Sequence, residues 1–408
     1  MSLLSYAEAL QQLLAGGRPL TEIESLATFA ATGRVLAAPL VSAIAVPPLD
    51  NSSMDGYALR SADVTSPGVS LAVAQRIPAG SVGHSLAPGT AARIFTGAPI
   101  PAGADAIVMQ EMCAHDGEHR VVVNHVPQPG DWIRRAGQDI RAGAEILGAG
   151  TRLSPAQLGL AASVGFAALP VYRRLRVALF STGDELVMPG EVAAEAMPPG
   201  AIYNSNRYLL RGLLQQLGCQ VGDLGIVPDN LAATRAALRE AAADHDLILT
   251  SGGVSVGEED HVKPAVQEEG ALALWKIAIK PGKPLAFGHV RSQANRCAFI
   301  GLPGNPVSSF VTFVMLVRPF ILKTQGARQH TPWALSLRAD FDWPRPDARR
   351  EFLRARRNQA GGLELFPNQG SGVLTSVAWA DGLIDNPPGQ PIRSGDAVSF
   401  LPFSELLY

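Results

Sequence analysis

The sequence has few cysteines and no excess charge of one sign, and both facts exclude classes of protein. Cys113, Cys219 and Cys297 are the only cysteines in 408 residues, and they lack any paired spacing. That pattern predicts neither a disulfide framework nor a cysteine-based zinc site, and it fits a reducing, cytoplasmic setting. Lysine and arginine number 34 against 36 aspartates and glutamates. This balance gives no support for a nucleic-acid partner, which usually needs a basic surface.

Long hydrophobic runs and nucleotide-binding fingerprints are also missing. The segment from Met1 to Ala15 lacks the basic region of a secretory signal. The apolar stretch from Phe310 to Leu322 is interrupted by Arg318 and Pro319. It is too short to span a bilayer, so we expect a buried helix and no membrane partner. Neither a Walker lysine motif nor a dinucleotide Gly-x-Gly-x-x-Gly occurs after a first strand, which excludes the standard nucleotide sites.

What is present is the composition of a compact globular protein, with 47% hydrophobic and 17% charged residues. This length predicts roughly two to four domains. Ser5 and Glu8 have the spacing of a capping box ahead of a first helix. A second helix is expected over 22–32 and another over 154–165. Between them, short apolar runs alternate with Pro, Gly and Asp from 41 to 145, which predicts an inserted β-rich domain.

From Arg176 onward, strand-like and helix-like segments alternate. Strands are expected at 177–180, 221–227, 247–250, 275–279, 285–287 and 298–300, and helices at 206–217, 230–242 and 306–322. Such alternation predicts a mainly parallel sheet with helices on both faces. From about Pro332 the sequence becomes β-rich again, which predicts a small separate β domain.

The most informative loop follows the strand at 247–250. Ser251, Gly252, Gly253 and Ser255 form a glycine-rich turn, and acidic side chains follow up to Asp260. Glycines let backbone N–H groups point together at an anion, and carboxylates can hold a hard cation such as magnesium. The loop therefore suggests a site for a phosphorylated ligand, with an ordinary turn as the alternative.

Other unusual turns also follow strands, and ligands of such sheets bind beyond the carboxyl ends of the strands. The turns at 182–185, 228–229 and 303–306 would therefore meet the glycine-rich turn at one edge. Lys276, Lys280 and Lys283 lie near that edge, where they are either a solvated face or anion ligands. The polar runs at 50–55, 96–99 and 137–140 are explained on composition alone by ordinary capped turns.

Taken together, six motifs in register resemble the molybdopterin molybdenumtransferase family, whose relatives include the gephyrin E-domain. The resemblance runs almost end to end. It rests on Asn-Ser-Ser-Met-Asp-Gly-Tyr-Ala at 51–58, Thr-Gly-Ala-Pro at 96–99, Ser-Thr-Gly-Asp-Glu-Leu at 181–186, Ser-Gly-Gly-Val-Ser-Val-Gly at 251–257, Lys-Pro-Gly-Lys-Pro at 280–284 and Leu-Pro-Gly-Asn-Pro-Val-Ser at 302–308. Two places depart from the family pattern: the alanine-rich segment 191–199 is somewhat long, and His261 lies where the family often has a tyrosine.

The resemblance implies an elongated homodimer with an α/β multidomain fold. A doubly wound, mainly parallel sheet domain of the molybdopterin-binding type is expected at 173–326. A discontinuous helical linker domain at 1–40 and 146–172 would carry the inserted β-rich domain at 41–145. A C-terminal β-barrel domain is expected at 327–408.

The resemblance also implies a reaction: molybdate is joined to the dithiolene of adenylylated molybdopterin and AMP is released, with magnesium as cofactor. The site is expected between the sheet domain of one subunit and the inserted β domain of the other. Transient contact with other molybdenum cofactor biosynthesis proteins is expected. Two alternatives stay open at this point, a molybdopterin adenylyltransferase and a non-catalytic, gephyrin-like scaffold.

Matching motifs carry the family's site residues onto this chain. The resemblance implies four catalytic carboxylates, Asp55, Glu185, Asp229 and Asp260, of which Asp55, Glu185 and Asp260 would also bind magnesium. The substrate-binding residues would be Thr96, Asp139, Ser251, Gly252, Gly253, Ser255, Lys276, Lys280, Pro303, Pro306, Arg350 and Ser371. The two lysines would hold anionic oxygens and the two prolines would shape the wall. No nucleophile–base pair is visible, so no covalent protein intermediate is expected.

Overall fold

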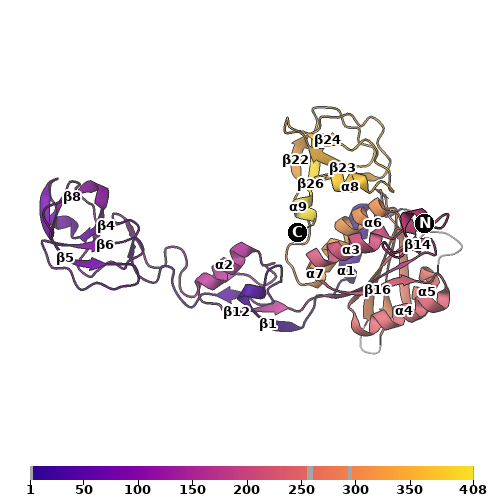
Figure 1. Ribbon diagram of the computed structural model, residues 1–408, viewed down its shortest axis with the longest axis horizontal. Coiled ribbons are helices and arrows are strands. Elements are labelled where there is room, and N and C mark those ends of the chain that lie inside the picture. Colours follow the sequence, from indigo (N-terminus) through magenta and orange to yellow (C-terminus); the bar gives the residue numbers. More distant parts are fainter. Residues whose placement is uncertain (1–2, 255–260, 293–295, 408) are drawn as a thin grey trace. The chain divides into compact units, whose positions relative to one another are not determined.

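The computed structural model describes residues 3–254, 261–292 and 296–407 (Figure 1). The chain forms two compact units. The first unit comprises Met1–Ala38, Ala149–Ser154 and Ala168–Tyr408, and the second comprises Pro39–Gly148 and Pro155–Ala167. This division into two units does not test the boundaries of the four predicted domains, which stay a prediction. Each unit is described by itself.

A six-stranded sheet forms the centre of the first unit, in the order β16-β13-β17-β21-β20-β18. Strands β16, β13, β17 and β21 are parallel, whereas β20 is antiparallel to both of its neighbours. The mainly parallel sheet expected from the sequence is therefore confirmed. The bounds are β13 (Arg176–Thr182), β16 (Gln220–Val227), β17 (Leu247–Ser251), β18 (Gly270–Lys276), β20 (Pro284–Arg291) and β21 (Arg296–Leu302). The strand expected at 275–279 is instead divided between β18 and the separate β19 (Ile279–Lys280).

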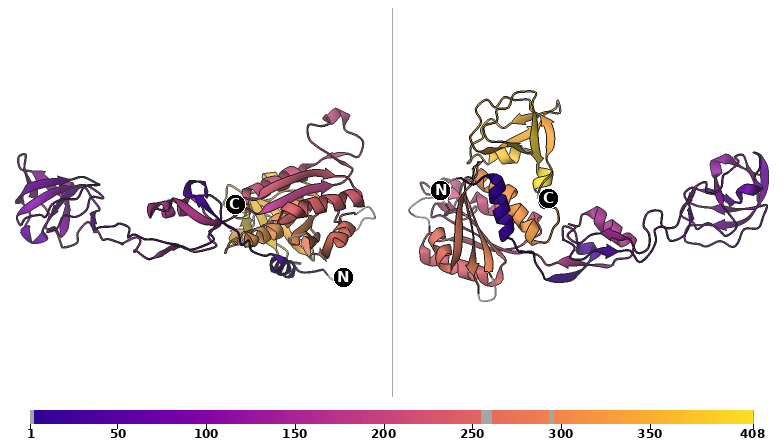
Figure 2. Two further views of the ribbon diagram at one scale, coloured as in Figure 1. Left: turned by 90° about the horizontal axis from the view of Figure 1, so that it is seen from below. Right: turned by 180° about the vertical axis from the view of Figure 1, so that it is seen from behind.

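Helices cover both faces of this sheet. Successive residues of a strand point to opposite faces, and here the residues on both faces are apolar. Val177, Leu179 and Leu249 belong to one buried cluster with α3 (Ser205–Gln216) and the helices from 306 to 324. Phe180 and Ile248 belong to another cluster with α4 (Leu231–Asp244) and α5 (Val262–Glu269). Helix α1 (Tyr6–Gly16) lies beside the first group (Figure 2). The predicted doubly wound arrangement is confirmed.

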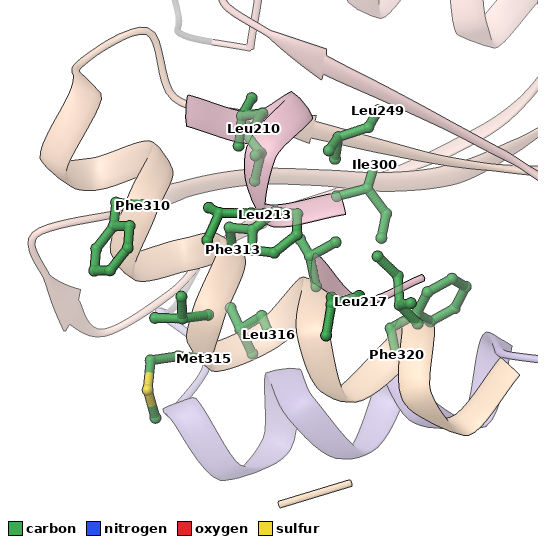
Figure 3. Packing of buried hydrophobic residues seen from close by; sticks show 14 of the residues in the cluster. Leu210, Leu213, Leu217, Leu249, Ile300, Phe310, Phe313, Met315, Leu316 and Phe320 are labelled. Carbon is green, nitrogen blue, oxygen red and sulfur yellow. The ribbon is translucent and has the colours of Figure 1, made fainter. Parts of the chain in front are cut away.

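One apolar helical run spans Pro306 to Thr324, and 94% of its most apolar 18-residue window is buried. It is therefore a core element, although its length and composition would suit a membrane span. It consists of α6 (Pro306–Thr312), the wider π-helical turn η5 (Phe313–Val317) and α7 (Arg318–Thr324). Its side chains fill the space between the sheet and α1 (Figure 3). Each fully buried Leu or Phe side chain stabilises the fold by about 1.5–3 kcal/mol. The buried helix expected from the sequence is confirmed.

A proline inside this run explains an unusual contact with α1. Pro319 has no N–H, so the carbonyl four residues earlier, that of Met315, loses its α-helical donor. The hydroxyl of Tyr6 donates to that carbonyl at 3.2 Å. Ser5 begins α1 as the expected capping box with Glu8, and this box places Tyr6 at the first helical position. A local sequence signal therefore positions a long-range hydrogen bond.

The helix predicted over 22–32 is wrong. This segment forms β1 (Ile23–Ala27), which pairs antiparallel with β12 (Ala168–Tyr172), followed by the 3-10 turn η1 (Thr28–Ala30). The partner strand lies far along the chain, so nothing local in the sequence indicates the pairing. Tertiary pairing overrides local helix propensity at such positions.

The second unit is β-rich, as predicted. Its six-stranded sheet has the order β7-β4-β6-β5-β9-β8 and contributes to two clusters of buried apolar residues. The strands are β4 (Gly56–Leu59), β5 (Val69–Ile77), β6 (Thr90–Ile94), β7 (Ala106–Met109), β8 (Cys113–His115) and β9 (Arg120–Val123). The unit also contains η2 (Ser61–Asp63), η3 (Gln110–Met112), the pairs β2 (Leu40–Val41) with β11 (Glu145–Leu147) and β3 (Asn51–Ser52) with β10 (Ile133–Arg134), and the predicted helix α2 (Pro155–Ser163).

The C-terminal residues of the first unit form a second β layer. Strand β19 pairs parallel with β23 and so joins this layer to the central region. The other strands pair antiparallel. The elements are β22 (Leu335–Arg338), β23 (Arg350–Arg357), β24 (Leu363–Leu365), α8 (Thr375–Trp379), β25 (Gly382–Asn386), β26 (Ala397–Pro402) and α9 (Phe403–Leu406).

Candidate active site

A pocket of about 760 Å³ lies at the carboxyl ends of β13, β17 and β21 in the first unit. The strand-end turns that the sequence analysis expected to meet do meet here. The predicted site residues in its wall are Glu185, Asp229, Ser251, Gly252, Gly253, Pro303 and Pro306. Ser255 and Asp260 lie outside the described residues.

Close packing at the glycine-rich turn requires glycine. Gly252 and Gly253 have φ angles of 92° and 65°, in the left-handed region that other residues rarely adopt. A Cβ on Gly252 would lie 2.8 Å from the carbonyl oxygen of Thr182, and one on Gly253 would lie 2.3 Å from a methyl group of Val262. The N–H of Gly252 donates to the carbonyl of Leu302 at 3.1 Å. One N–H of the expected anion cradle is thus used to close the turn against β21.

Asn206 connects two walls of the pocket. Its Nδ2 donates to Ser251 Oγ at 3.1 Å and to the carbonyl of Gly304 at 2.7 Å. Within the described residues, Asn206 Oδ1 and Thr182 Oγ1 are buried without a hydrogen-bond partner. Buried polar atoms are nearly always paired, so these two suit a polar ligand. The sequence analysis missed Asn206, although its place at the start of an expected helix after a strand was a usable signal.

Two helix N-termini reach the same pocket. Helix α3 begins after Asn204, whose Oδ1 accepts a hydrogen bond from the N–H of Arg207 at 3.1 Å. The long helical run begins after Asn305, with Pro306 at its first position. Both Asn204 and Asn305 line the pocket. The N-terminal end of a helix carries partial positive charge, so the pocket favours an anion.

Glu185 and Asp229 are the two predicted carboxylates in the pocket wall. The described residues contain no group of three or more His, Cys, Asp and Glu side chains that could hold a metal. Magnesium in phosphate-handling sites, however, binds through one or two carboxylates together with substrate phosphates and water. The donor set in this pocket fits that mode of binding.

Lys280 lies elsewhere, at the junction with the C-terminal layer. Its Nζ is 3.2 Å from Glu351 Oε1 and 3.3 Å from Asp347 Oδ2. Glu351 is fully buried and also accepts a hydrogen bond from Trp343 Nε1 at 2.8 Å. The Arg349 guanidinium, with a smaller contribution from Lys280, holds the pKa of Asp347 far below its usual range.

The remaining predicted residues of the first unit lie outside the wall of the pocket. Of the residues described, Lys276, Arg350 and Ser371 do not line the pocket. Lys276 is exposed. Arg350 forms a bidentate pair with Asp385 at 2.5 and 2.6 Å. The carbonyl of Ser371 accepts from the N–H of Val307 at 3.0 Å, which brings the neighbouring Gly372 into the pocket wall.

Asp55, Thr96 and Asp139 belong to the second unit. The N–H and the hydroxyl of Thr96 both donate to Asp55 Oδ1 at 2.8 Å, and they lower the pKa of that carboxyl. Asp139 lines a separate pocket of about 840 Å³ together with Arg135 and Arg141. The structure thus brings Asp55 and Thr96 into direct contact.

Comparison with known proteins gives a consistent result along the whole chain. Three family models match: "MoeA N-terminal region (domain I and II)" at residues 4–165, "Probable molybdopterin binding domain" at 178–323 and "MoeA C-terminal region (domain IV)" at 336–403. A molybdopterin molybdenumtransferase of Haemophilus influenzae is 40% identical over 395 residues, covering 95% of each chain. One from Bacillus subtilis is 33% identical over 383 residues, covering 90% of this chain and 87% of its own.

Solved structures agree. The crystal structure of a molybdopterin biosynthesis moeA protein from Pyrococcus horikoshii OT3 superposes with a TM-score of 0.85 at 28% identity. The match covers 98% of this chain and all of that one. The similarity therefore extends over both units.

Proposed function

Since this chain belongs to the molybdopterin molybdenumtransferase family, it acts in molybdenum cofactor biosynthesis, and we propose that it transfers molybdenum from molybdate to adenylylated molybdopterin with release of AMP. One observation carries the proposal. The pocket at the strand ends combines two helix N-termini, two carboxylates and unpaired buried polar atoms. These are the groups that a phosphorylated pterin and an oxyanion require.

The residues of the pocket would contribute in different ways to binding the phosphorylated substrate. Ser251, Asn206 and the helix N-termini would bind phosphate oxygens and exclude water from them. Pro303 and Pro306 form a rigid part of the wall. Asp55, Thr96, Asp139, Lys276, Lys280, Arg350, Ser371, Ser255 and Asp260 remain proposed contributors on the family resemblance.

We propose magnesium as the cofactor. Glu185 and Asp229 would hold it in this pocket together with phosphate oxygens of the substrate, and Asp55 and Asp260 remain proposed ligands. When bound, magnesium would polarise the phosphoanhydride and so assist the departure of AMP. By holding magnesium, Glu185 and Asp229 would also keep its positive charge close to the phosphate oxygens.

The test is release of AMP from purified protein with adenylylated molybdopterin, magnesium and molybdate. Release should depend on molybdate, and Glu185→Gln should lower its rate by about a hundredfold or more, as removal of a transition-state charge contact does. Glu195→Gln, an exposed site in the same strand–helix connection, is the matched control. AMP release that is independent of molybdate would contradict the proposal. Consumption of ATP and molybdopterin with pyrophosphate release would instead support adenylyltransferase activity.

We also propose that the protein is a cytoplasmic homodimer. The support is the family membership and three free cysteines, two of them buried. Burial raises the pKa of the Cys219 and Cys297 thiols to about 12, so both stay protonated and unreactive at neutral pH.

A further inference from the structure

Two arginines of the second unit lie side by side on neighbouring strands. Arg76 on β5 and Arg93 on β6 are register partners in a parallel pairing, so both side chains leave the same face of the sheet. Among the residues that the structure describes, neither guanidinium forms an ion pair with a carboxylate. Like charges directly opposite each other destabilise a sheet, so the arrangement needs a compensating interaction.

Phe95 supplies part of that compensation. The Cζ atoms of Arg76 and Arg93 lie 4.5 and 4.6 Å from the centroid of the Phe95 ring. Both distances are within the range of a cation–π interaction. The ring attracts both cations, but it has no net charge and cannot neutralise them.

Arg93 is fixed in place by uncharged hydrogen-bond partners, and its charge also helps to lower the pKa of the Asp55 carboxyl. Its guanidinium donates to the carbonyl of Gly56 at 2.8 Å and to Gln110 Oε1 at 2.5 Å. It also lies 5.3 Å from the ring centroid of the buried Tyr57. Arg76 is exposed and Phe95 is half-buried, so the pair of cations can be reached from solvent. Arg93 is therefore held in place beside Phe95, and Arg76 is held by its contact with the same ring.

We propose that Arg76, Arg93 and Phe95 form a binding site for the phosphate group of a small phosphorylated ligand. The planar guanidinium presents forked N–H donors that match phosphate oxygens in a bidentate manner. A doubly charged phosphate would neutralise both cations at once. The site lies wholly in the second unit, and its argument does not use the transfer reaction.

Residue-resolved arginine modification tests the site in the full-length protein. Phenylglyoxal reacts with accessible guanidinium groups, and mass spectrometry gives the rate at each arginine. Inorganic phosphate and AMP are the two probes. A probe at ten times its Kd should slow the reaction of Arg76 about tenfold. Arg120, on β9 of the same sheet and half-exposed, should be unaffected.

The two probes distinguish the source of the phosphate. Equal protection by both would identify a site for the phosphate group alone, and stronger protection by AMP would identify a nucleotide site. Equal modification rates at Arg76 with and without millimolar probe would overturn the proposal.

A pair of variants gives an independent measurement. Arg76→Gln and Arg120→Gln each remove one positive charge from the same sheet. Equilibrium dialysis of radiolabelled phosphate should show affinity at one site falling about tenfold in the first variant only, because a charge-assisted contact is lost. Circular dichroism melting checks that both variants fold. Identical binding by both variants would refute the site, whereas the transfer reaction is tested separately through Glu185.

Discussion

The hydroxyl of Thr96 adjusts the charge state of Asp55. The N–H and the hydroxyl both donate to the same carboxylate oxygen, and together they lower the pKa of Asp55. A carboxyl with a depressed folded pKa stabilises the fold above its ordinary unfolded pKa, and that contribution is lost as the pH falls through the folded value. Thr96 therefore keeps Asp55 ionised down to a lower pH than an ordinary aspartate.

Thr96→Val tests this role, because it removes the hydroxyl and keeps the N–H. The pKa of Asp55 should rise part of the way to its ordinary value, so its stabilising contribution should be lost at a higher pH than in the unchanged protein. Carbon-detected NMR titration of the aspartate carboxyls measures it, with Asp55→Asn to identify the signal. An unchanged titration curve would show that the hydroxyl has no influence on the carboxyl.

Two lysines that the sequence places together have different surroundings. Lys280 pairs with the fully buried Glu351, whereas Lys276 is exposed. Lys280→Ala should lower the free energy of unfolding by about 1–2 kcal/mol, since a buried carboxylate loses its cation while solvent screens part of the effect. Lys276→Ala should change it by less than about 0.5 kcal/mol.

Denaturant unfolding of the two alanine variants measures this difference. In the background of Glu351→Gln, Lys280→Ala should be less destabilising, because of the two ion pairs of Lys280 only the one with Asp347 remains. Equal losses of stability in the two lysine variants would contradict the structural role of Lys280.

The meeting of several proposed site residues in one pocket was predictable from the sequence because they follow strands. Glu185, Ser251 and Pro303 occupy strand-end turns, and parallel strands bring such turns to one edge. The start of an expected helix was the local signal for Asn206, but its contacts with Ser251 and Gly304 were not predictable because they join segments far apart in the chain. Arg76 and Arg93 were missed for the same reason, since only the β5–β6 pairing makes them neighbours.

At the scale of elements, the contact between α1 and the long helical run is the most specific one. The Tyr6 hydroxyl donates to the carbonyl that Pro319 leaves without its α-helical donor. The ring of Tyr6 also packs edge-to-face on Phe352 at 5.6 Å. Tyr6 thus links α1 both to a core helix and to the C-terminal layer.

Tyr6→Phe keeps the ring and removes the donor. The Met315 carbonyl should then lose the hydrogen bond from this hydroxyl, at a cost of about 0.5–1.5 kcal/mol in the free energy of unfolding. In the background of Pro319→Ala, which restores an N–H, the same change should cost clearly less. A double-mutant cycle from denaturant unfolding measures the coupling. Additive effects would mean that the proline and the tyrosine act independently.

Elements with local signals were predictable and elements made by distant pairing were not. The capping box at Ser5 and Glu8 correctly predicted the start of α1, because the signal and the structure are only three residues apart. The segment 23–27 became a strand because its partner at 168–172 fixes it. Helical spacing in a short segment cannot reveal such a partner.

At the scale of the whole molecule, the homodimer remains a prediction. Light scattering after size-exclusion chromatography should give about twice the chain mass of 42.9 kDa if two identical subunits associate. We expect Asp55→Asn and Glu185→Gln to impair the reaction, and mixing the two proteins should recover activity if their intact residues complement one another. A monomer mass, or no recovery after mixing and subunit exchange, would argue against shared sites.

The connection between β13 and α3 can vary in length during evolution without disturbing the sheet. Strand β14 (Leu186–Val187) pairs with β15 (Ile202–Tyr203), so the two ends of the excursion at 188–201 are held side by side. Doubling the length of a loop whose ends are held together raises the entropic cost of closing it by only about 0.6 kcal/mol. Insertions and deletions can therefore accumulate here while the strand registers stay fixed. A protein engineer can therefore graft a new segment here, between the pocket-lining Leu186 and Ile202, with little disturbance to folding.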